Sequence, residues 1–233
     1  MSNYFDQKGF ISNSELGELK KLMRNEEEMD LTDIYNFGSL VHGFVTEPHK
    51  IDHENKALVE GENKIYFSDD QYLQAQRMYE AAKKDKVVDL FLKSCKKEHE
   101  FYRKKFKIEY KGYEVEIPVR AKLDFLNKGI SIGADLKGIK CDTRDQFITA
   151  IEYFDYDRQA AWYMDIANLD QFMFIGLSKK KNPRTGNHDV FKFVMIRGDE
   201  NYQKGKAKYS RLAFYYFHLI YNLNVSLNEK PSV

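Results

Sequence analysis

Apolar residues in the first hundred positions recur mostly at the spacing of α-helices. Serine precedes the first such stretch, and Ser68-Asp69-Asp70 precedes the longest, which are typical helix starts. Pro48 is expected to end the second helix. The charged, irregular residues 49–67 predict a loop with a short strand. The expected helices span residues 15–24, 33–45 and 68 to about 94.

Further along the chain the period changes to alternation, which indicates β-strands. Asn127-Lys128-Gly129 is a hairpin turn signal between two of them. Helices are expected again over residues 143–167 and 202–221. The expected strands are 106–126, with a turn at 111–112, then 130–136, 172–177 and 190–196.

This order of elements predicts an α/β fold in which helices flank a central mixed β-sheet. No convincing boundary divides the chain, so residues 1–233 are expected to form one domain. Its helical part covers about residues 10–100, and its core covers about residues 101–221.

Composition narrows the possible chemistry. The 233 residues are 42% hydrophobic and 15% aromatic, which is enough for a sizeable core. The net charge of +1 means that any contact with nucleic acid must come from local patches. Cys95 and Cys141 are too few for a four-thiolate iron–sulfur cluster or zinc site. A polar opening sequence and the lack of a membrane-length apolar run predict a cytoplasmic protein without membrane contact.

Charged residues gather at the ends of two consecutive expected strands. Asp124 ends one, and Asp135-Leu136-Lys137 ends the next, with Asp135 and Lys137 on the same face. Two carboxylates and an ammonium suit Mg²⁺- or Mn²⁺-dependent cleavage of phosphodiesters. The alternative is a cross-strand salt bridge on a solvated sheet face. The small and apolar run 130–134 indicates an interior strand, which favours the functional interpretation.

Several further motifs occur with this pair in a fixed order along most of the chain. The sequence resembles the PD-(D/E)XK nuclease superfamily, and within it exonuclease VIII (RecE-type) and RecB-like phage nucleases. Leu123 stands where the superfamily often has Pro, and Gly138-Ile139 stand where it often has Thr-Thr. The matching segments are Ile11–Leu16, Gly38–Gly43 with Glu47-Pro48, Lys122–Asp124, Asp135–Lys137 and Gln159–Tyr163.

The resemblance implies a restriction-endonuclease-like core and specific roles for residues. Asp124, Asp135 and His42 would bind Mg²⁺, for which Mn²⁺ would substitute. Gln159 and Tyr163 would join the site from a helix, where a spacing of four places them on one face. The implied catalytic set is Asp124, Asp135, Lys137, Gln159, Tyr163 and His42.

The resemblance also implies an activity and partners. We expect a metal-dependent deoxyribonuclease, an exonuclease that degrades linear double-stranded DNA in phage-type recombination. A homo-oligomeric ring and a single-strand annealing protein are compatible partners. The alternatives are a structure-specific endonuclease of the same fold and a catalytically inactive DNA-binding recombination module. Intact Asp124, Asp135 and Lys137 argue against the inactive module.

Other charged residues have two interpretations each. Glu47 could assist metal binding or cap the turn before Pro48. Glu98 and Glu100 could supply another carboxylate, but a solvated, charged helix end is favoured. A basic loop could contact DNA phosphates or be a solvated hairpin tip. Its members are Lys179, Lys180, Lys181 and Arg184.

Overall fold

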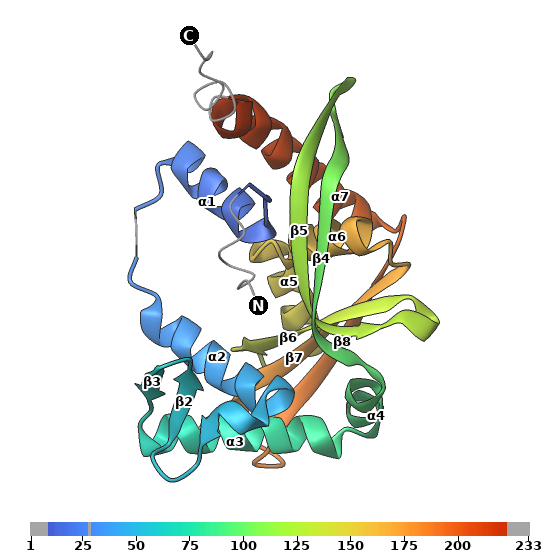
Figure 1. The fold of residues 1–233 in the computed structure, drawn as a ribbon. Helices are drawn as coiled ribbons and strands as arrows, with labels where there is room; N and C mark the ends of the chain where they lie inside the picture. Colours follow the sequence, from blue (N-terminus) through green and yellow to red (C-terminus); the bar gives the residue numbers. More distant parts are fainter. Residues whose placement is uncertain (1–8, 28, 223–233) are drawn as a thin grey trace.

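The central sheet has five strands in the order β4-β5-β6-β7-β8 (Figure 1). The structure is a computed structural model that describes residues 9–27 and 29–222. β6 and β7 run parallel and the other neighbours antiparallel, so the sheet is mixed, as the sequence predicts. The strands are β4 (Lys96–Tyr110), β5 (Tyr113–Asn127), β6 (Ile132–Ile139), β7 (Gln171–Lys181) and β8 (His188–Ile196).

Helices cover both faces of the sheet. Polar side chains start many of them: Ser12 caps the first helix in a capping box with Glu15, and Asp199 caps the last. A parallel pair needs a crossover, and two helices supply the one between β6 and β7. The helices are α1 (Asn13–Arg24), α2 (Thr32–Thr46), α3 (Asp69–Lys84), α4 (Lys86–Ser94), α5 (Arg144–Tyr153), α6 (Tyr156–Ala167) and α7 (Glu200–Tyr216).

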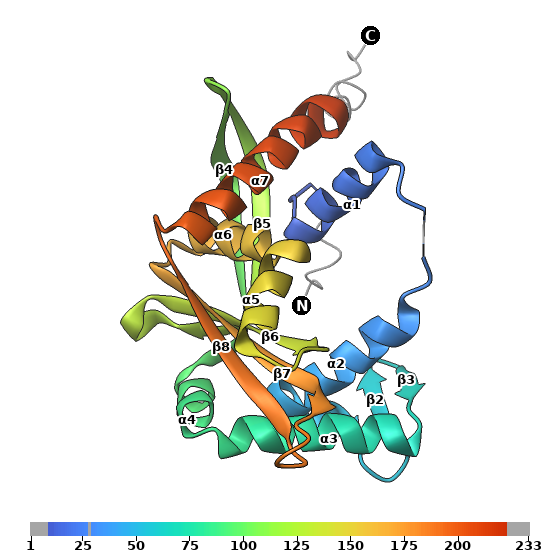
Figure 2. The ribbon, with the colours of Figure 1, turned by 180° about the vertical axis from the view of Figure 1, so that it is seen from behind.

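Two apolar layers result, one on each face. α5, α6 and α7 pack on one face, around Trp162 of α6 and Phe172 of β7, and Figure 2 shows this side of the molecule. α2 and α3 pack on the other face around Phe125 and Met78. Complete burial of such a side chain contributes roughly 1.5–3 kcal/mol. These two layers fix the sheet between the helices, and with it the ends of its strands.

The structure corrects three expected boundaries. The long helix expected to reach Ser94 breaks at Asp85, whose carboxylate caps the backbone N–H groups of Val87 and Val88 and so starts α4. The next strand begins at Lys96 and not near residue 106, because Lys96 already pairs with Leu126 in the β4–β5 ladder. Residues 49–67 contain a small antiparallel sheet rather than one short strand: β1 (Ile51–Asp52), β2 (Ala57–Glu60) and β3 (Asn63–Tyr66).

Two local contacts hold α2 in place. A Cβ at Gly43 would lie 3.0 Å from Leu58 and 3.2 Å from Ile51, so glycine allows the small sheet to approach α2 closely. Lys97 Nζ donates to the carbonyl of Val45 at 2.7 Å, which satisfies an orphan carbonyl of the helix C-terminus. The second contact joins α2 to the start of β4.

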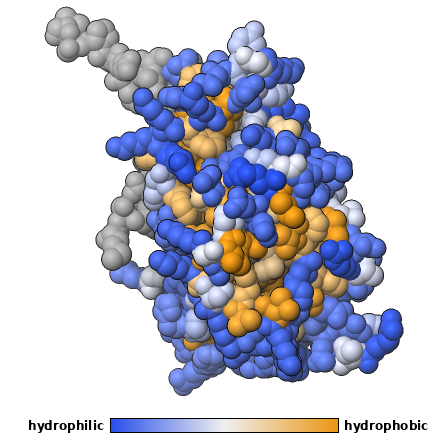
Figure 3. Space-filling model, turned by 90° about the vertical axis from the view of Figure 1, so that its right-hand side faces the viewer, coloured by the Kyte–Doolittle hydropathy of each residue, from blue (hydrophilic) through white to orange (hydrophobic). Residues whose placement is uncertain are grey.

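Two surface findings complete the description. In residues 9–27 and 29–222, no helix combines the length and the apolarity that a membrane crossing needs. Figure 3 shows apolar side chains gathered over the middle of one face, with hydrophilic residues around them.

Candidate metal and catalytic centre

The site lies where β5 and β6 separate. Their ladder pairs Asn127 with Ile132, Leu126 with Gly133 and Phe125 with Ala134, and then stops. One step further in the same register, Asp124 faces Asp135. There the Asp124 carboxylate accepts a hydrogen bond from the backbone N–H of Leu136 at 3.1 Å, in place of a backbone carbonyl. The side chain therefore closes the ladder and is held at the end of it.

Two ligand-type side chains converge on Asp124 from different elements. His42 Nε2, from α2, lies 3.3 Å from Asp124 Oδ2 and 3.3 Å from Glu98 Oε1. Glu98 lies in β4, opposite Asp124 in the register that pairs Lys97 with Phe125 and His99 with Leu123. One ligand atom from each of the three falls within 4.8 Å of the other two. This is a suitable donor set for a divalent cation.

The charges of this group alter one another's titration. Burial alone would lower the pKa of His42, but the nearby Asp124, Glu98 and Asp135 carboxylates raise it to about 9. Burial would raise the pKa of Asp124, yet contact with His42 holds it below its ordinary value. Burial and the Asp124 charge raise the pKa of Asp135 to about 6, despite the opposing effect of Lys137. At neutral pH the His42 imidazolium and the Lys137 ammonium therefore balance the carboxylates, and a metal ion bound at His42 would displace the Nε2 proton.

Lys137 extends the centre towards α6. Its Nζ lies 2.7 Å from Asp135 Oδ2 and donates to Gln159 Oε1 at 3.0 Å. The Gln159 amide is 3.3 Å from Asp135 Oδ1 and 3.2 Å from the Tyr163 hydroxyl. Lys137 Nζ is also 4.5 Å from the centre of the Tyr156 ring. Gln159 and Tyr163 share a helix face at spacing four, as the sequence predicts.

Burial separates this arrangement from a surface salt bridge. Asp135 is 4% exposed, and the Lys137 side chain is 18% exposed. The pair does not lie on a solvated sheet face, so that alternative is wrong. The six residues expected from the sequence form two contacting groups, His42 with Asp124 and Asp135 with Lys137, Gln159 and Tyr163, which adjoin at the end of the β5–β6 ladder. Their catalytic and metal-binding roles remain predictions.

Glu98 corrects the sequence analysis. It does not belong to a solvated helix end, because Lys96 already begins β4 and Glu98 points to His42. Lys122 Nζ holds its other oxygen at 2.6 Å. The backbone of Glu98 is left-handed, with φ 53°, which is an uncommon conformation for a glutamate within a strand. Glu47 contacts Lys50 at 2.8 Å, which favours the turn interpretation for that residue.

The expected basic loop divides between strand and loop. Lys179, Lys180 and Lys181 belong to β7, and the loop begins at Asn182. Lys179 Nζ lies 4.9 Å from the centre of the Phe37 ring, and Lys180 pairs with Asp142. Lys181 and Arg184 are exposed, and together with Lys180 they line a hollow of about 210 Å³.

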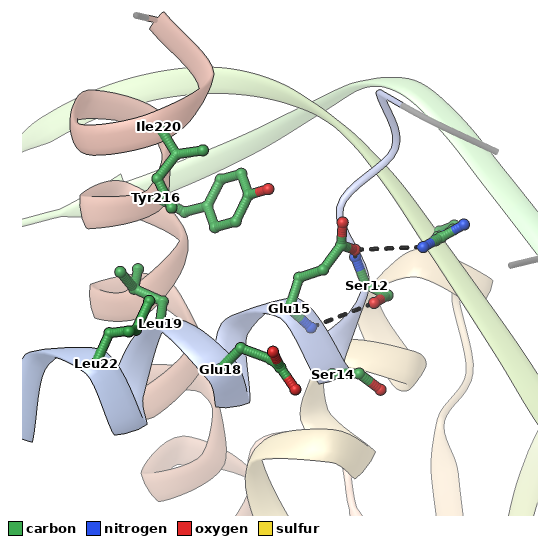
Figure 4. Close-up of a pocket in the computed structure, with 9 residues that line it drawn as sticks. Ser12, Ser14, Glu15, Glu18, Leu19, Leu22, Tyr216 and Ile220 are labelled. Carbon is green, nitrogen blue, oxygen red and sulfur yellow. Dashed lines mark hydrogen bonds and ion pairs between the residues drawn. The ribbon is translucent and has the colours of Figure 1, made fainter. Parts of the chain in front are cut away.

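A larger cavity, of about 370 Å³, lies elsewhere, between α1 and the end of α7 (Figure 4). Its lining includes Leu19, Leu22 and Tyr216, and the Glu15 carboxylate lies 3.5 Å from Arg120 at its side. None of the residues of the candidate centre lines it.

A family model matches most of the chain, and solved structures are similar to it. Residues 7–213 match the family described as a PDDEXK-like domain of unknown function, DUF3799. No curated protein matches the chain. A phage-related exonuclease from Haemophilus somnus 129PT is similar in structure at 14% identity and a TM-score of 0.44, over 92% of this chain and 96% of that one. An alkaline exonuclease from Laribacter hongkongensis is similar at 11% identity and a TM-score of 0.39, over 97% of each chain.

The mixed sheet, the D-x-K pair within β6 and the family match define the class: this is a nuclease-type fold of the PD-(D/E)XK superfamily. Within that class, the chain belongs to the PDDEXK-like family DUF3799.

Proposed function

We propose that this protein is a Mg²⁺-dependent deoxyribonuclease whose active site is built on Asp124, Asp135 and Lys137. The observation that carries the proposal is the buried ladder end, where two opposed carboxylates, a histidine and a lysine converge. A purely structural role explains this arrangement poorly, because burial of several carboxylates together costs stability.

The donor set fits a hard divalent cation. His42 Nε2 and Glu98 Oε1 are buried, and they lie 3.3 Å from each other, with Asp124 Oδ2 also 3.3 Å from the ring nitrogen. Carboxylate oxygens are the ligands that Mg²⁺ and Mn²⁺ prefer, and imidazole is compatible with Mn²⁺. Asp124, His42 and Glu98 would hold the ion, with Asp135 beside them. When bound, such an ion lowers the pKa of a coordinated water and neutralises charge on the phosphate.

The chain's own residues divide the remaining work. Lys137 is an ammonium beside the donor set, and it can orient the attacking water or stabilise the charge that develops on the phosphate. Gln159 fixes Lys137 from one side, and Asp135 fixes it from the other. Tyr163 supports Gln159 through its hydroxyl. The lysine is therefore preorganised, which reduces the reorganisation required during reaction.

The proposed substrate is linear double-stranded DNA, degraded from its ends. Lys181 at the end of β7 and Arg184 in the loop that follows are exposed, and both are suited to contact phosphates. The apolar area in Figure 3 is compatible with a homo-oligomeric ring. A role in phage-type recombination with a single-strand annealing protein belongs to the same proposal. A structure-specific endonuclease is the second candidate, since the same centre serves either activity.

One digestion experiment tests the proposal and separates the two candidates. End-labelled linear duplex and covalently closed circular duplex are incubated with the protein in Mg²⁺ and in EDTA. An exonuclease degrades the linear DNA and leaves the circle intact, and EDTA stops it. Cleavage of both forms identifies an endonuclease. Full activity in EDTA contradicts the proposed function. So does a wild-type protein that cleaves neither DNA and cannot be distinguished from Asp124→Ala.

A further inference from the structure

Three aromatic rings lead outward from Lys137 at the turn between α5 and α6, from the half-buried Tyr156 to the exposed Phe154 and Tyr153. The Tyr156 ring lies 4.5 Å from Lys137 Nζ, measured to the ring centre. The ring of Phe154 is 5.7 Å from that of Tyr156, with 30° between their planes. The ring of Tyr153 is 4.9 Å from that of Phe154. The three rings thus form a continuous series that begins at the candidate catalytic lysine.

Their exposure is unusual for side chains of this kind. Tyr153 is 79% exposed and Phe154 is 53% exposed, although both are large and apolar enough to belong in a core. Three neighbouring rings at one turn form an apolar surface rather than a single scattered residue. Such a surface beside the candidate catalytic centre is suited to bind a flat, apolar group.

The turn that carries the rings is rigidly held. Asp155 adopts a left-handed conformation, with φ 55°, and is only 9% exposed. Its carboxylate pairs with Lys20 of α1, with Lys208 of α7 at 3.1 Å and with Arg158 at 3.5 Å. The exposed rings are therefore not the result of a loose loop. Preorganised rings lose little conformational entropy when they bind a ligand.

The position of the rings beside Lys137 narrows the class of ligand that they would bind. If Lys137 contacts a scissile phosphate, the nearest flat groups in the substrate are the nucleobases on either side of that phosphate. Aromatic side chains stack on nucleobases of any sequence. Bases within a duplex already stack on each other, so the faces of unpaired bases are the ones available. A duplex frayed at its end presents such bases.

We propose that Tyr153, Phe154 and Tyr156 form a stacking platform for unpaired nucleobases next to the phosphate at Lys137. This inference rests on the proposed nuclease function and deepens it. The platform holds the separated strand at the centre and favours substrates whose terminal base pairs are open. It gives the single-stranded segment, rather than the intact duplex, the closest contact with the catalytic residues.

Base-dependent binding tests the platform. Fluorescence anisotropy measures the affinity for a short labelled oligoadenylate and for an abasic strand of equal length, in Ca²⁺, with a gel to confirm that both strands stay intact. Wild type should bind the base-bearing strand more tightly. Tyr153→Ser and Phe154→Ser should each lose on the order of 10-fold for that strand and nothing for the abasic one. Tyr153→Phe and Phe154→Tyr should keep the wild-type affinities.

The matched control is Tyr113→Ser. Tyr113 is 67% exposed, and it stands on the same strand as Asp124 but roughly 35 Å along it at the usual rise per residue. This variant should bind both strands as wild type does. Equal losses on the two strands, or no loss in the serine variants, would overturn the platform. If wild type cleaves linear duplex but shows no base-dependent binding, the platform is contradicted and the nuclease function still holds. If binding depends on the bases but no cleavage occurs, the nuclease function is contradicted and the platform holds as a binding site.

Discussion

Glu98 lies opposite Asp124 across the β4–β5 ladder, and His42 Nε2 is 3.3 Å from a carboxylate oxygen of each. The two acids approach one ring nitrogen from neighbouring strands, which is the relationship of two ligands to one site. Glu98→Gln should therefore lower Mn²⁺ affinity, measured by calorimetry, by on the order of 10-fold, because a neutral amide is a weaker donor than a carboxylate.

Glu100→Gln is the control for this prediction. Glu100 is exposed on the same strand two residues away and accepts from the Tyr102 hydroxyl at 2.9 Å. The Glu100→Gln variant should therefore bind Mn²⁺ with the wild-type affinity. Equal affinities for wild type and Glu98→Gln would remove Glu98 from the ligand set.

Thr46 determines which nitrogen of His42 is available to a metal. Its hydroxyl donates to the His42 carbonyl at 3.0 Å, so its oxygen is left to accept from His42 Nδ1 at 3.1 Å. When the ring loses its Nε2 proton on binding a metal and keeps the one on Nδ1, the lone pair on Nε2 faces the acids. Thr46→Val should weaken Mn²⁺ binding by on the order of 10-fold, as loss of a ligand's supporting partner does. Thr46→Ser should retain the affinity, and equal weakening in both variants would show a packing effect instead.

Asp155 should contribute a pH-dependent part of stability. Burial would raise its pKa, but hydrogen bonds from Lys20 and Lys208 and the charge of Arg158 outweigh this, so its pKa is lowered. A lowered folded-state pKa gives stability that is present above the unfolded pKa, about 4, and is lost as pH falls through the folded value. Asp155→Asn should cost about 2 kcal/mol in the free energy of unfolding at neutral pH.

Urea unfolding at a series of pH values measures this. Asparagine tolerates the left-handed backbone, so the comparison isolates the charge. The difference between wild type and Asp155→Asn should shrink on acidification below about pH 4. A difference that stays constant down to the acid limit would mean that the ion pairs contribute no stability.

Gly205 should be indispensable for packing between α6 and α7. A Cβ there would lie 2.2 Å from the Asp157 carbonyl oxygen, which is backbone and has no room to move. Gly205→Ala should lower the free energy of unfolding by about 3 kcal/mol. Gly38→Ala is the control, because no atom lies within 4 Å of its Cβ position in α2. It should stabilise the protein by up to about 1 kcal/mol through helix propensity. Similar losses in both variants would contradict the close approach.

The sequence was sufficient for the features that depend on local pattern. Alternation placed Asp135 and Lys137 on one face, and the turn at Asn127 joined the right strands. The four-residue spacing brought Gln159 and Tyr163 together. Ordered motifs indicated that His42 belongs to the same centre.

Features that depend on distant contacts were missed. The break at Asp85 follows from a side chain that caps a helix start and also pairs with Lys192 of β8, 107 positions later. Glu98 was assigned to a helix end because Lys96–Glu100 is uniformly polar, and its partner His42 lies in another helix. The signal that could have found Glu98 was its register opposite Asp124. That register can be read only if β4 is known to begin ten residues before its apolar alternation does.

The most direct test of the proposed active site compares Lys137→Ala with Asp124→Ala. Lys137 lies beside the donor set and not within it, and an ammonium does not ligate a cation. Calorimetric Mn²⁺ binding should be equal or slightly tighter in Lys137→Ala, whereas single-turnover cleavage of linear duplex should fall by on the order of 100-fold or more. Asp124→Ala should lose metal binding and cleavage together. Near wild-type cleavage by Lys137→Ala would contradict the account, because the D-x-K pair would then be a buried structural ion pair and not a catalytic one.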